Sequence, residues 1–202
     1  MQRVNIGLIG CGTVGTGVAR LLLDNQAIIR SRTGIDVALK FVADIDVERV
    51  RAASLPEDIF TTDAMQVVHD PEVDIIVEMV GGETFAKDII LTAFERGKHV
   101  VTANKALLAA QGAELIKSAA DNGVDLAFEA AIGGCMPIVK TLRESLVGNH
   151  INAMTGILNG TCNYILSKIT DEGIDFDTAL KQAQRSGFAE ADPTLDVEGL
   201  DA

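Results

Sequence analysis

The sequence predicts an α/β protein with a doubly wound parallel sheet, followed by the start of an α+β domain. Three observations predict this fold class. Short apolar runs alternate with helical stretches over the first part of the chain, which is typical of parallel strands joined by crossover helices. A glycine-rich turn at residues 10–15 separates the first apolar run from the first helical stretch. Near residue 150 this alternation stops, and two helical stretches follow one another.

The strands of the sheet are expected where apolar runs are short and continuous, because such strands are buried on both faces. These runs lie at residues 4–9, 37–43, 74–79, 99–102 and 124–128. Helices are expected at residues 13–30, 84–96 and 105–121, the last two ending at Gly97 and at Asn122-Gly123.

The second domain is expected to begin with a longer strand at residues 151–158. Helices follow at residues 162–171 and 176–186. The last residues, "ADPTLDVEGLDA", offer no further strand or helix to close a core. We therefore expect a dinucleotide-binding domain at residues 1–149 and an incomplete substrate-binding and dimerisation domain at residues 150–202.

The composition of the 202-residue chain excludes several classes of partner. It has 17 Lys and Arg against 29 Asp and Glu, a formal charge of −12, and no basic cluster, so we expect neither nucleic acid nor a membrane surface as a partner. No run of ~18 apolar residues and no signal peptide is present, so we expect a cytoplasmic protein. The three cysteines, Cys11, Cys135 and Cys162, are widely spaced and are interpreted as free thiols.

The turn Gly10-Cys11-Gly12-Thr13-Val14-Gly15 follows an expected strand and opens an expected helix. In that context the three glycines allow a tight turn, a close approach of the backbone to a pyrophosphate, and close packing of the helix. The helix N-terminus then offers free N–H groups to the phosphates. We interpret the turn as the dinucleotide site of a Rossmann-like domain; the alternative is a glycine turn that only joins two elements.

Asp44 ends the second expected strand, where a carboxylate would bind the ribose hydroxyls of NAD. Its separation from the glycine turn exceeds the usual ~20 residues, because residues 25–36 form an extension. Arg49 and Arg51 lie close enough in sequence to meet the 2′-phosphate of NADP, so the choice between the two cofactors stays open. Gly81, at the end of the 74–79 strand, would let a ribose or nicotinamide approach; an ordinary turn is the alternative.

Lys105 follows the 99–102 strand and lies in the first turn of a helix. The helix dipole disfavours a cation there, and a lysine with a loosened proton could serve as an acid or base during hydride transfer. The alternative is an exposed lysine whose stem lies along the edge of the sheet.

Glu129 begins "EAAIGGCMP", a carboxylate at a strand end followed by a glycine turn and Pro137. The carbonyls of such a turn could bind a cation; a domain-joining loop is the alternative. Cys135 in this loop could act as a nucleophile, but no histidine is near it in sequence.

Asn159-Gly160-Thr161 opens the helix predicted at residues 162–171, where N–H groups and a hydroxyl could bind a carboxylate. Simple helix capping is the alternative. The acidic stretch containing Glu190, Asp196 and Asp201 suits either a solvated surface or a site for an ammonium group.

Taken together, the motifs GCGTVG, TANK, FEAAIGGCMP, GILNGTCNYIL and GFAEADPTLDVEGLDA resemble homoserine dehydrogenase over the whole chain. This resemblance implies reduction of aspartate semialdehyde to homoserine with NADPH or NADH, on the branch leading to threonine and methionine, and a homodimer in the full-length protein. It implies cofactor contacts from Gly10, Gly12, Thr13, Val14, Gly15, Thr102 and Lys105, with Lys105 as the catalytic candidate. It also implies a sodium-type cation at Glu129 and the carbonyls of Ile132, Gly134 and Met136, and substrate contacts from Gly160, Thr161, Glu190, Asp196 and Asp201.

The sequence departs from the family pattern in two places. Family members carry a second lysine, commonly assigned as the proton donor, a few residues beyond the position of Asp201, whereas this sequence ends at Ala202. Phe188 replaces a tyrosine present in some members. We therefore expect the N-terminal portion of such an enzyme, either active or limited to binding. The alternatives are another semialdehyde oxidoreductase, such as a cysteine-dependent aspartate-semialdehyde dehydrogenase, and a non-catalytic NAD(P)-binding module.

Overall fold

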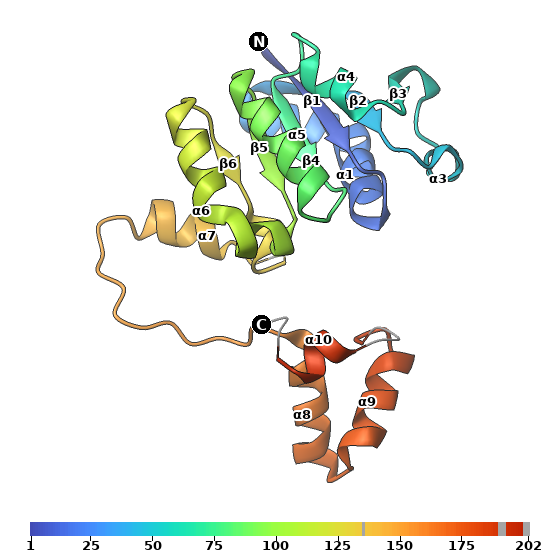
Figure 1. Cartoon of the computed structure of the whole chain (residues 1–202), viewed down its shortest axis with the longest axis vertical. Helices are drawn as coiled ribbons and strands as arrows, with labels where there is room; N and C mark the ends of the chain where they lie inside the picture. Colours follow the sequence, from blue (N-terminus) through green and yellow to red (C-terminus); the bar gives the residue numbers. More distant parts are fainter. Residues whose placement is uncertain (135, 190–192, 200–202) are drawn as a thin grey trace. The chain divides into compact units, whose positions relative to one another are not determined.

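The computed structural model describes residues 1–134, 136–189 and 193–199. The chain divides into two compact units, residues 1–147 and 148–202 (Figure 1). The first unit contains β1 (Gln2–Ile9), α1 (Thr13–Asp24), α2 (Gln26–Thr33), β2 (Ile35–Ala43), α3 (Val47–Ala52), β3 (Phe60–Thr61), α4 (Ala64–His69), β4 (Ile75–Glu78), α5 (Thr84–Glu95), β5 (His99–Thr102), α6 (Lys105–Asp121), β6 (Leu126–Ala127) and α7 (Ile138–Lys140). The second unit contains α8 (Gly160–Glu172), α9 (Phe176–Arg185) and α10 (Thr194–Val197).

The first unit is built on a six-stranded sheet in the order β3-β2-β1-β4-β5-β6, and every pair of neighbouring strands is parallel. This is the order of a doubly wound dinucleotide-binding fold, so the predicted Rossmann-like class is confirmed. The strand order reverses between β1 and β4. At such a switch point the loops after neighbouring strands diverge and leave a crevice at the carboxyl edge of the sheet.

Two apolar clusters bury the faces of this sheet. Leu8, Val42 and Val77 pack with Ala19 of α1 and Val50 of α3 in one cluster. The other cluster is formed mainly by α4, α5 and α6, which cover strands β1, β4, β5 and β6, and Phe94 is its largest fully buried side chain. Figure 1 shows α5 and α6 lying along these strands. Helices on both faces explain why the strands read as unbroken apolar runs.

The helix predicted at residues 13–30 is wrong as a single element, because the structure ends α1 at Asp24 and begins α2 at Gln26. Asn25 lies between them with φ −107° and ψ 14°, and its side-chain Nδ2 donates to the carbonyl of Leu21 at 3.2 Å. An asparagine that bonds the backbone in this way competes with helix continuation. The predicted extension before β2 therefore takes the form of α2.

The strand predicted at residues 151–158 is also wrong. The structure gives this segment no regular structure, and its apolar side chains, including Met154, Ile157 and Leu158, are exposed. A strand needs a neighbour for its N–H and C=O groups, and no described residue of the second unit forms one. The two helices predicted after this segment correspond to α8 and α9, which pack through Ile165, Ala179 and Ala183.

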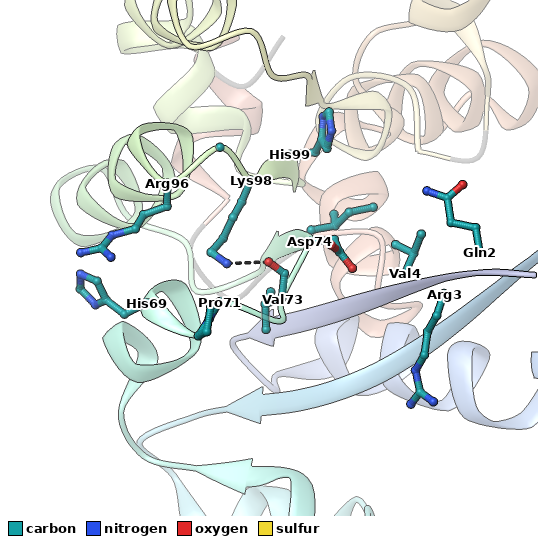
Figure 2. A pocket seen from close by; sticks show the side chains of 12 residues that line it. Gln2, Arg3, Val4, His69, Pro71, Val73, Asp74, Arg96, Lys98 and His99 are labelled. Carbon is teal, nitrogen blue, oxygen red and sulfur yellow. Dashed lines mark hydrogen bonds between the residues drawn. The ribbon is translucent and has the colours of Figure 1, made fainter.

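Lys98 lies at the opposite, amino edge of the sheet, just before β5, and is only 5% exposed. Its ammonium donates to the carbonyls of Asp70 at 2.6 Å and Val73 at 2.5 Å. Burial lowers the pKa of Lys98 below its ordinary value. The side chain also lines a cavity of about 650 Å³, with Arg96 and His69 beside it (Figure 2).

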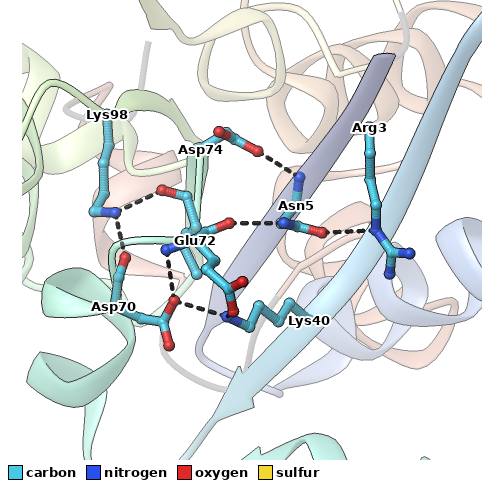
Figure 3. Close-up of polar contacts among 8 residues, drawn as sticks. Arg3, Asn5, Lys40, Asp70, Glu72, Asp74 and Lys98 are labelled. Atoms are coloured by element: carbon cyan, nitrogen blue, oxygen red, sulfur yellow. Dashed lines mark hydrogen bonds and ion pairs between the residues drawn. The ribbon is translucent and has the colours of Figure 1, made fainter. Parts of the chain in front are cut away.

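Asp70 and Glu72, in the turn before β4, bind Lys40 of β2 (Figure 3). Lys40 Nζ is 2.8 Å from Asp70 Oδ1 and 2.6 Å from Glu72 Oε2. The hydrogen bond from Lys40 holds the pKa of Asp70 below its ordinary value of 3.8. Partial burial alone would lower the pKa of Lys40, but the hydrogen bonds and charges of the two carboxylates outweigh it and raise that pKa.

The Lys40→Met variant is expected to lower the free energy of unfolding near neutral pH by about 1 kcal/mol, because Asp70 loses the cation that stabilises its ionised form. A lowered folded-state pKa stabilises the protein above the unfolded value and ceases to do so as the pH falls through the folded value. The difference between wild type and variant should therefore shrink below pH 3.8. Urea unfolding at a series of pH values measures it.

The matched control is Arg51→Met, which removes an ion pair with Glu48 whose side chains are 64% and 80% exposed. Its cost should be close to zero at every pH. If the difference in unfolding free energy between wild type and Lys40→Met stayed constant down to about pH 2, the role of Asp70 would be contradicted.

Candidate functional site

A cavity of about 660 Å³ lies at the carboxyl edge of the sheet, at the switch point between β1 and β4. Gly10 and Gly12 line it from the loop after β1, Asp44 and Arg49 from the segment after β2, and Gly81 from the loop after β4. Ile45, also on its wall, keeps an apolar side chain 90% exposed. The structure thus brings together four of the predicted cofactor positions, Gly10, Gly12, Asp44 and Gly81.

The cavity at the amino edge is less suited to a ligand of this fold, because ligands of open α/β sheets bind outside the carboxyl ends of the strands. The basic side chains His69 and Arg96 on its wall also have a structural explanation. His69 is the last residue of α4 and Arg96 follows the last residue of α5. Helix C-termini carry a partial negative charge that favours cations.

Each glycine of the turn after β1 meets a different requirement. Gly10 has φ +95°, and a Cβ on it would lie 2.6 Å from the carbonyl carbon and oxygen of Met79. A Cβ on Gly15 would lie 1.9 Å from the carbonyl oxygen of Gly10. Gly12 is different, since its nearest neighbour would be Arg49 Nη1 at 4.0 Å. Gly10 and Gly15 are therefore required by packing, whereas Gly12 leaves open space at the cavity.

The N-terminus of α1 opens at this cavity with Gly12 as its N-cap. Among the described residues, no side chain caps this end, and the first turn contains no acidic residue. Thr13 and Val14 are exposed there. The free N–H groups of a helix that is 12 residues long therefore remain available to an anion.

Asp44 ties the end of β2 to the glycine turn. Its Oδ2 accepts the N–H of Cys11 at 2.6 Å, and its Oδ1 accepts the N–H of Asp46 at 2.8 Å. The carboxylate thus has a structural role that the sequence did not predict, and the remaining lone pairs of each oxygen are left for a ligand. Arg49 lies at the wall of the cavity, and its Nε is 3.5 Å from Asp46 Oδ2.

Thr102 ends β5 and is fully buried, so its hydroxyl does not face the edge. It donates to Glu78 Oε2 at 2.6 Å. Glu78, at the end of β4, is also fully buried. Glu78 was not predicted as a site residue, although a carboxylate that ends the apolar run "DIIVE" was a usable signal.

Lys105 is the first residue of α6, as predicted, and is exposed at the carboxyl edge. The residue before it, Asn104, is the N-cap, and its side chain accepts the N–H of Leu107 at 3.1 Å. The backbone N–H of Lys105 donates to the carbonyl of Ala103 at 3.1 Å. The cap fixes where α6 begins and hence where Lys105 leaves the backbone.

The loop after β6 folds around Glu129. Its two carboxylate oxygens accept the N–H groups of Val139 at 2.8 Å and Lys140 at 2.9 Å, both in α7. The carbonyl of Met136 accepts the N–H of Ile138 at 2.9 Å. The predicted cation ligands Ile132 and Gly134 lie in the same loop and are exposed.

In the second unit, Asn159, Thr161 and Asp196 of the predicted substrate motifs form hydrogen bonds that join the start of α8 to residues far along the chain. Asn159 caps α8 by accepting the N–H of Cys162 at 2.7 Å, and it donates to Asp196 Oδ1 at 2.7 Å. Thr161 is buried and donates to the carbonyl of Phe188 at 2.5 Å. Gly160 is the exposed first residue of α8. The predicted positions Glu190 and Asp201 lie outside the described residues.

The cysteines offer no exposed nucleophile among the described residues. Cys11 is fully buried, and Cys162 Sγ donates to the carbonyl of Asp196 at 3.1 Å. Cys135 lies outside the described residues. In the part of the chain that the structure describes, no three His, Cys, Asp or Glu side chains are grouped to hold a metal ion. No described helix has the length and apolar character needed to cross a membrane.

Comparison with known proteins links both units to one family. A family model described as "Homoserine dehydrogenase, NAD binding domain" matches residues 10–129, and one described as "Homoserine dehydrogenase" matches residues 137–202. The homoserine dehydrogenase of Bacillus subtilis (strain 168) is 45% identical over 202 residues, which are 100% of this chain and 47% of that protein. That of Synechocystis is 48% identical over 199 residues, covering 98% of this chain and 46% of that protein.

Solved structures give the same answer. The homoserine dehydrogenase of Thiobacillus denitrificans aligns with a TM-score of 0.92 at 45% identity, over 100% of this chain and 46% of that one. A hyperthermophilic archaeal homoserine dehydrogenase in complex with NADPH aligns with a TM-score of 0.82 at 26% identity, over 99% of this chain and 66% of that one. The chain therefore spans about half the length of the bacterial relatives it matches.

The Gly15→Ala variant is expected to lower the free energy of unfolding by about 2 kcal/mol, or to prevent folding, because its Cβ collides with the carbonyl of Gly10. The matched control is Gly17→Ala in the same helix, where an added Cβ meets nothing within 4 Å. It should stabilise the protein by about 1 kcal/mol through helix propensity. Thermal and urea unfolding of both variants measure the contrast, and equal effects would contradict the packing role of Gly15.

Proposed function

Because the chain belongs to the homoserine dehydrogenase family, we propose that its protein reduces aspartate semialdehyde to homoserine with a reduced nicotinamide cofactor. The single observation that carries this proposal is the glycine turn that opens the uncapped N-terminus of α1 onto the cavity at the switch point. The aspartate-semialdehyde dehydrogenase alternative is not favoured, since the matched families and relatives are homoserine dehydrogenases.

We assign residues 1–149 as the dinucleotide-binding domain, because the residues at the cavity of the first unit fit a dinucleotide. Gly12 leaves room for a pyrophosphate, and the first N–H groups of α1, from Thr13, Val14 and Gly15, would bind it. Gly10 would keep the turn tight enough for this approach. The exposed apolar side chain of Ile45 would cover the adenine face. When bound, the nicotinamide supplies a hydride to the aldehyde carbon.

We propose NADPH as the preferred cofactor. Asp44 already holds two backbone N–H groups, so its carboxylate is turned toward the glycine turn. Arg49 places a guanidinium at the cavity wall, which suits the 2′-phosphate of NADP. The archaeal relative in complex with NADPH supports the same choice. Asp44 would contact the ribose with its remaining lone pairs.

We propose that Lys105 acts beside the nicotinamide, with Gly81 shaping the adjoining edge and the buried Thr102 supporting that edge through Glu78. The Asn104 cap fixes its backbone at the first residue of a 17-residue helix, at the carboxyl edge of the sheet. The alkoxide that forms when the aldehyde carbon accepts a hydride needs a proton, which a lysine can hold or deliver.

We propose that residues 150–202 form part of the substrate-binding and dimerisation domain. Gly160 and Thr161 at the start of α8 would bind the substrate carboxylate, and Glu190, Asp196 and Asp201 would bind its ammonium group. The exposed apolar side chains at residues 151–158 support burial against a second copy, and so a homodimer. We also propose that the protein is cytoplasmic and that its substrate is a small molecule.

The loop after β6 would hold a sodium ion. Its donors are the Glu129 carboxylate and the carbonyls of Ile132, Gly134 and Met136, an all-oxygen set that fits a hard cation. Glu129 and Met136 already accept backbone N–H groups and would use their remaining lone pairs. The ion would fix this loop between β6 and α7 without taking part in hydride transfer.

The proposed function is tested by mixing the 202-residue chain with aspartate semialdehyde and either NADPH or NADH. Loss of reduced-nicotinamide absorbance reports turnover, and cofactor fluorescence reports binding with no tryptophan background. Turnover supports the enzyme, whereas saturable binding without turnover supports the non-catalytic module for this length of chain. Absence of binding contradicts the proposal. Gly17→Ala serves as the control and should bind as the wild type does.

Arg49→Ala is expected to weaken NADPH binding about tenfold, because the 2′-phosphate loses a charge-assisted hydrogen bond. NADH lacks that phosphate, so its dissociation constant should change by about twofold at most. The control is Arg51→Ala, since Arg51 pairs with Glu48 at 2.7 Å. Fluorescence titration with each cofactor measures the effect. Equal weakening of both cofactors would contradict the assignment of the phosphate to Arg49.

Lys105→Ala is expected to lower kcat about 100-fold, because proton transfer to the alkoxide loses its donor, with a much smaller change in cofactor affinity. The measurement uses whichever length of the chain turns over aspartate semialdehyde. The control is Lys117→Ala on the same helix, where Lys117 pairs with Asp121. A proportional loss of turnover and affinity would make Lys105 a binding residue only.

A further inference from the structure

Glu78 carries a fully buried carboxylate at the end of β4. Its Oε1 accepts the N–H groups of Val80 at 2.9 Å and Gly81 at 3.1 Å, and its Oε2 accepts the hydroxyl of Thr102 at 2.6 Å. All three partners donate, which suits the acceptor-only character of a carboxylate. The parallel register explains the last contact, because Glu78 and Thr102 are paired across β4 and β5.

The hydrogen bonds continue from Thr102 into the start of α6. Thr102 Oγ1 accepts the N–H of Asn104 at 3.0 Å, and Asn104 Nδ2 donates to the carbonyl of Gly82 at 2.6 Å. Asn104 also caps α6 through Leu107. The chain of bonds therefore leaves Glu78, crosses to the loop after β5 and returns to the loop after β4.

We propose that Glu78 is a positioning residue that holds these two loops together, so that Gly81 and the start of α6 with Lys105 form one rigid wall of the cofactor site. This inference rests on the proposed function and deepens it. Gly81 has φ +73° and an added Cβ would meet nothing within 4 Å, so side-chain packing does not hold Gly81 itself. The two N–H groups bound to Glu78 and the carbonyl bound to Asn104 fix it instead.

The position of Glu78 in the sheet sets it apart from neighbouring strand ends. Ile9, its register partner on β1, and Ala43, at the end of β2, are apolar and buried. Burying an ion carries a large desolvation cost. At Glu78 the carboxylate holds the N–H groups of Val80 and Gly81, two residues of the loop after β4 that line the cavity. A purely structural link between β4 and β5 would need no carboxylate, because their ladder hydrogen bonds already join them.

The test uses two variants. Glu78→Gln keeps the shape of the side chain but places the two N–H donors of an amide next to groups that also donate, the N–H groups of Val80 and Gly81 and the hydroxyl of Thr102. Thr102→Val removes the bridging hydroxyl. Amide hydrogen exchange by NMR and NADPH titration are measured for each. In both variants we expect exchange at the Asn104 amide to rise about tenfold and NADPH to bind about tenfold more weakly. Thr102→Ser keeps the hydroxyl and should restore most of the protection of the Asn104 amide.

The matched control is Lys98→Met, which removes a buried charge from the amino edge of the same sheet. It should lower the free energy of unfolding without changing the NADPH dissociation constant or Asn104 exchange. The proposal is overturned if Glu78→Gln speeds exchange at Val80 and Gly81 only, or if Lys98→Met weakens NADPH binding equally. If the wild type binds no cofactor, the proposed function and the cofactor role of Glu78 both fail, and the exchange data alone decide whether Glu78 couples the loops.

Discussion

The close approach of α1 to the glycine turn is the constraint on which the cofactor edge depends. A Cβ at Gly15 would lie 1.9 Å from the Gly10 carbonyl, and one at Gly10 would lie 2.6 Å from the backbone of Met79. Three backbone segments therefore meet at van der Waals distance, and only glycine permits it. Because α1 is fixed this close to β4, the free N–H groups at its N-terminus lie at the cavity of the switch point.

Polar contacts fix both edges of the sheet, but with different consequences. At the amino edge Asn5, Lys40 and Lys98 bind the turn before β4, and this turn has no further role in our proposal. At the carboxyl edge Glu78 and Asn104 bind the loop after β4, and Glu78 also binds Thr102 at the end of β5. Loops lack the ladder bonds that hold strands. A site built from loops therefore needs side chains such as these to keep its geometry.

The sequence predicted the parts of the fold that depend on local pattern. The apolar runs located β1, β2, β4 and β5, and Lys105 was correctly placed at the first residue of α6. The strand at residues 151–158 was wrong because a strand depends on a partner, which an apolar pattern does not reveal. Glu78 was missed for a related reason. Its role follows from the register that pairs it with Thr102, a contact across 24 residues of sequence.

Asp44 shows how a structural role constrains a functional one. A carboxylate at this strand end was expected to bind ribose, and its oxygens also hold the N–H groups of Cys11 and Asp46. These bonds fix the orientation of the carboxylate, so it can approach a ribose only through the lone pairs that remain. Arg49 is not fixed in this way, since its side chain is about half exposed beside Asp46. The geometry therefore gives the guanidinium more freedom than the carboxylate to adapt to the cofactor, which is the physical basis for expecting a phosphate there.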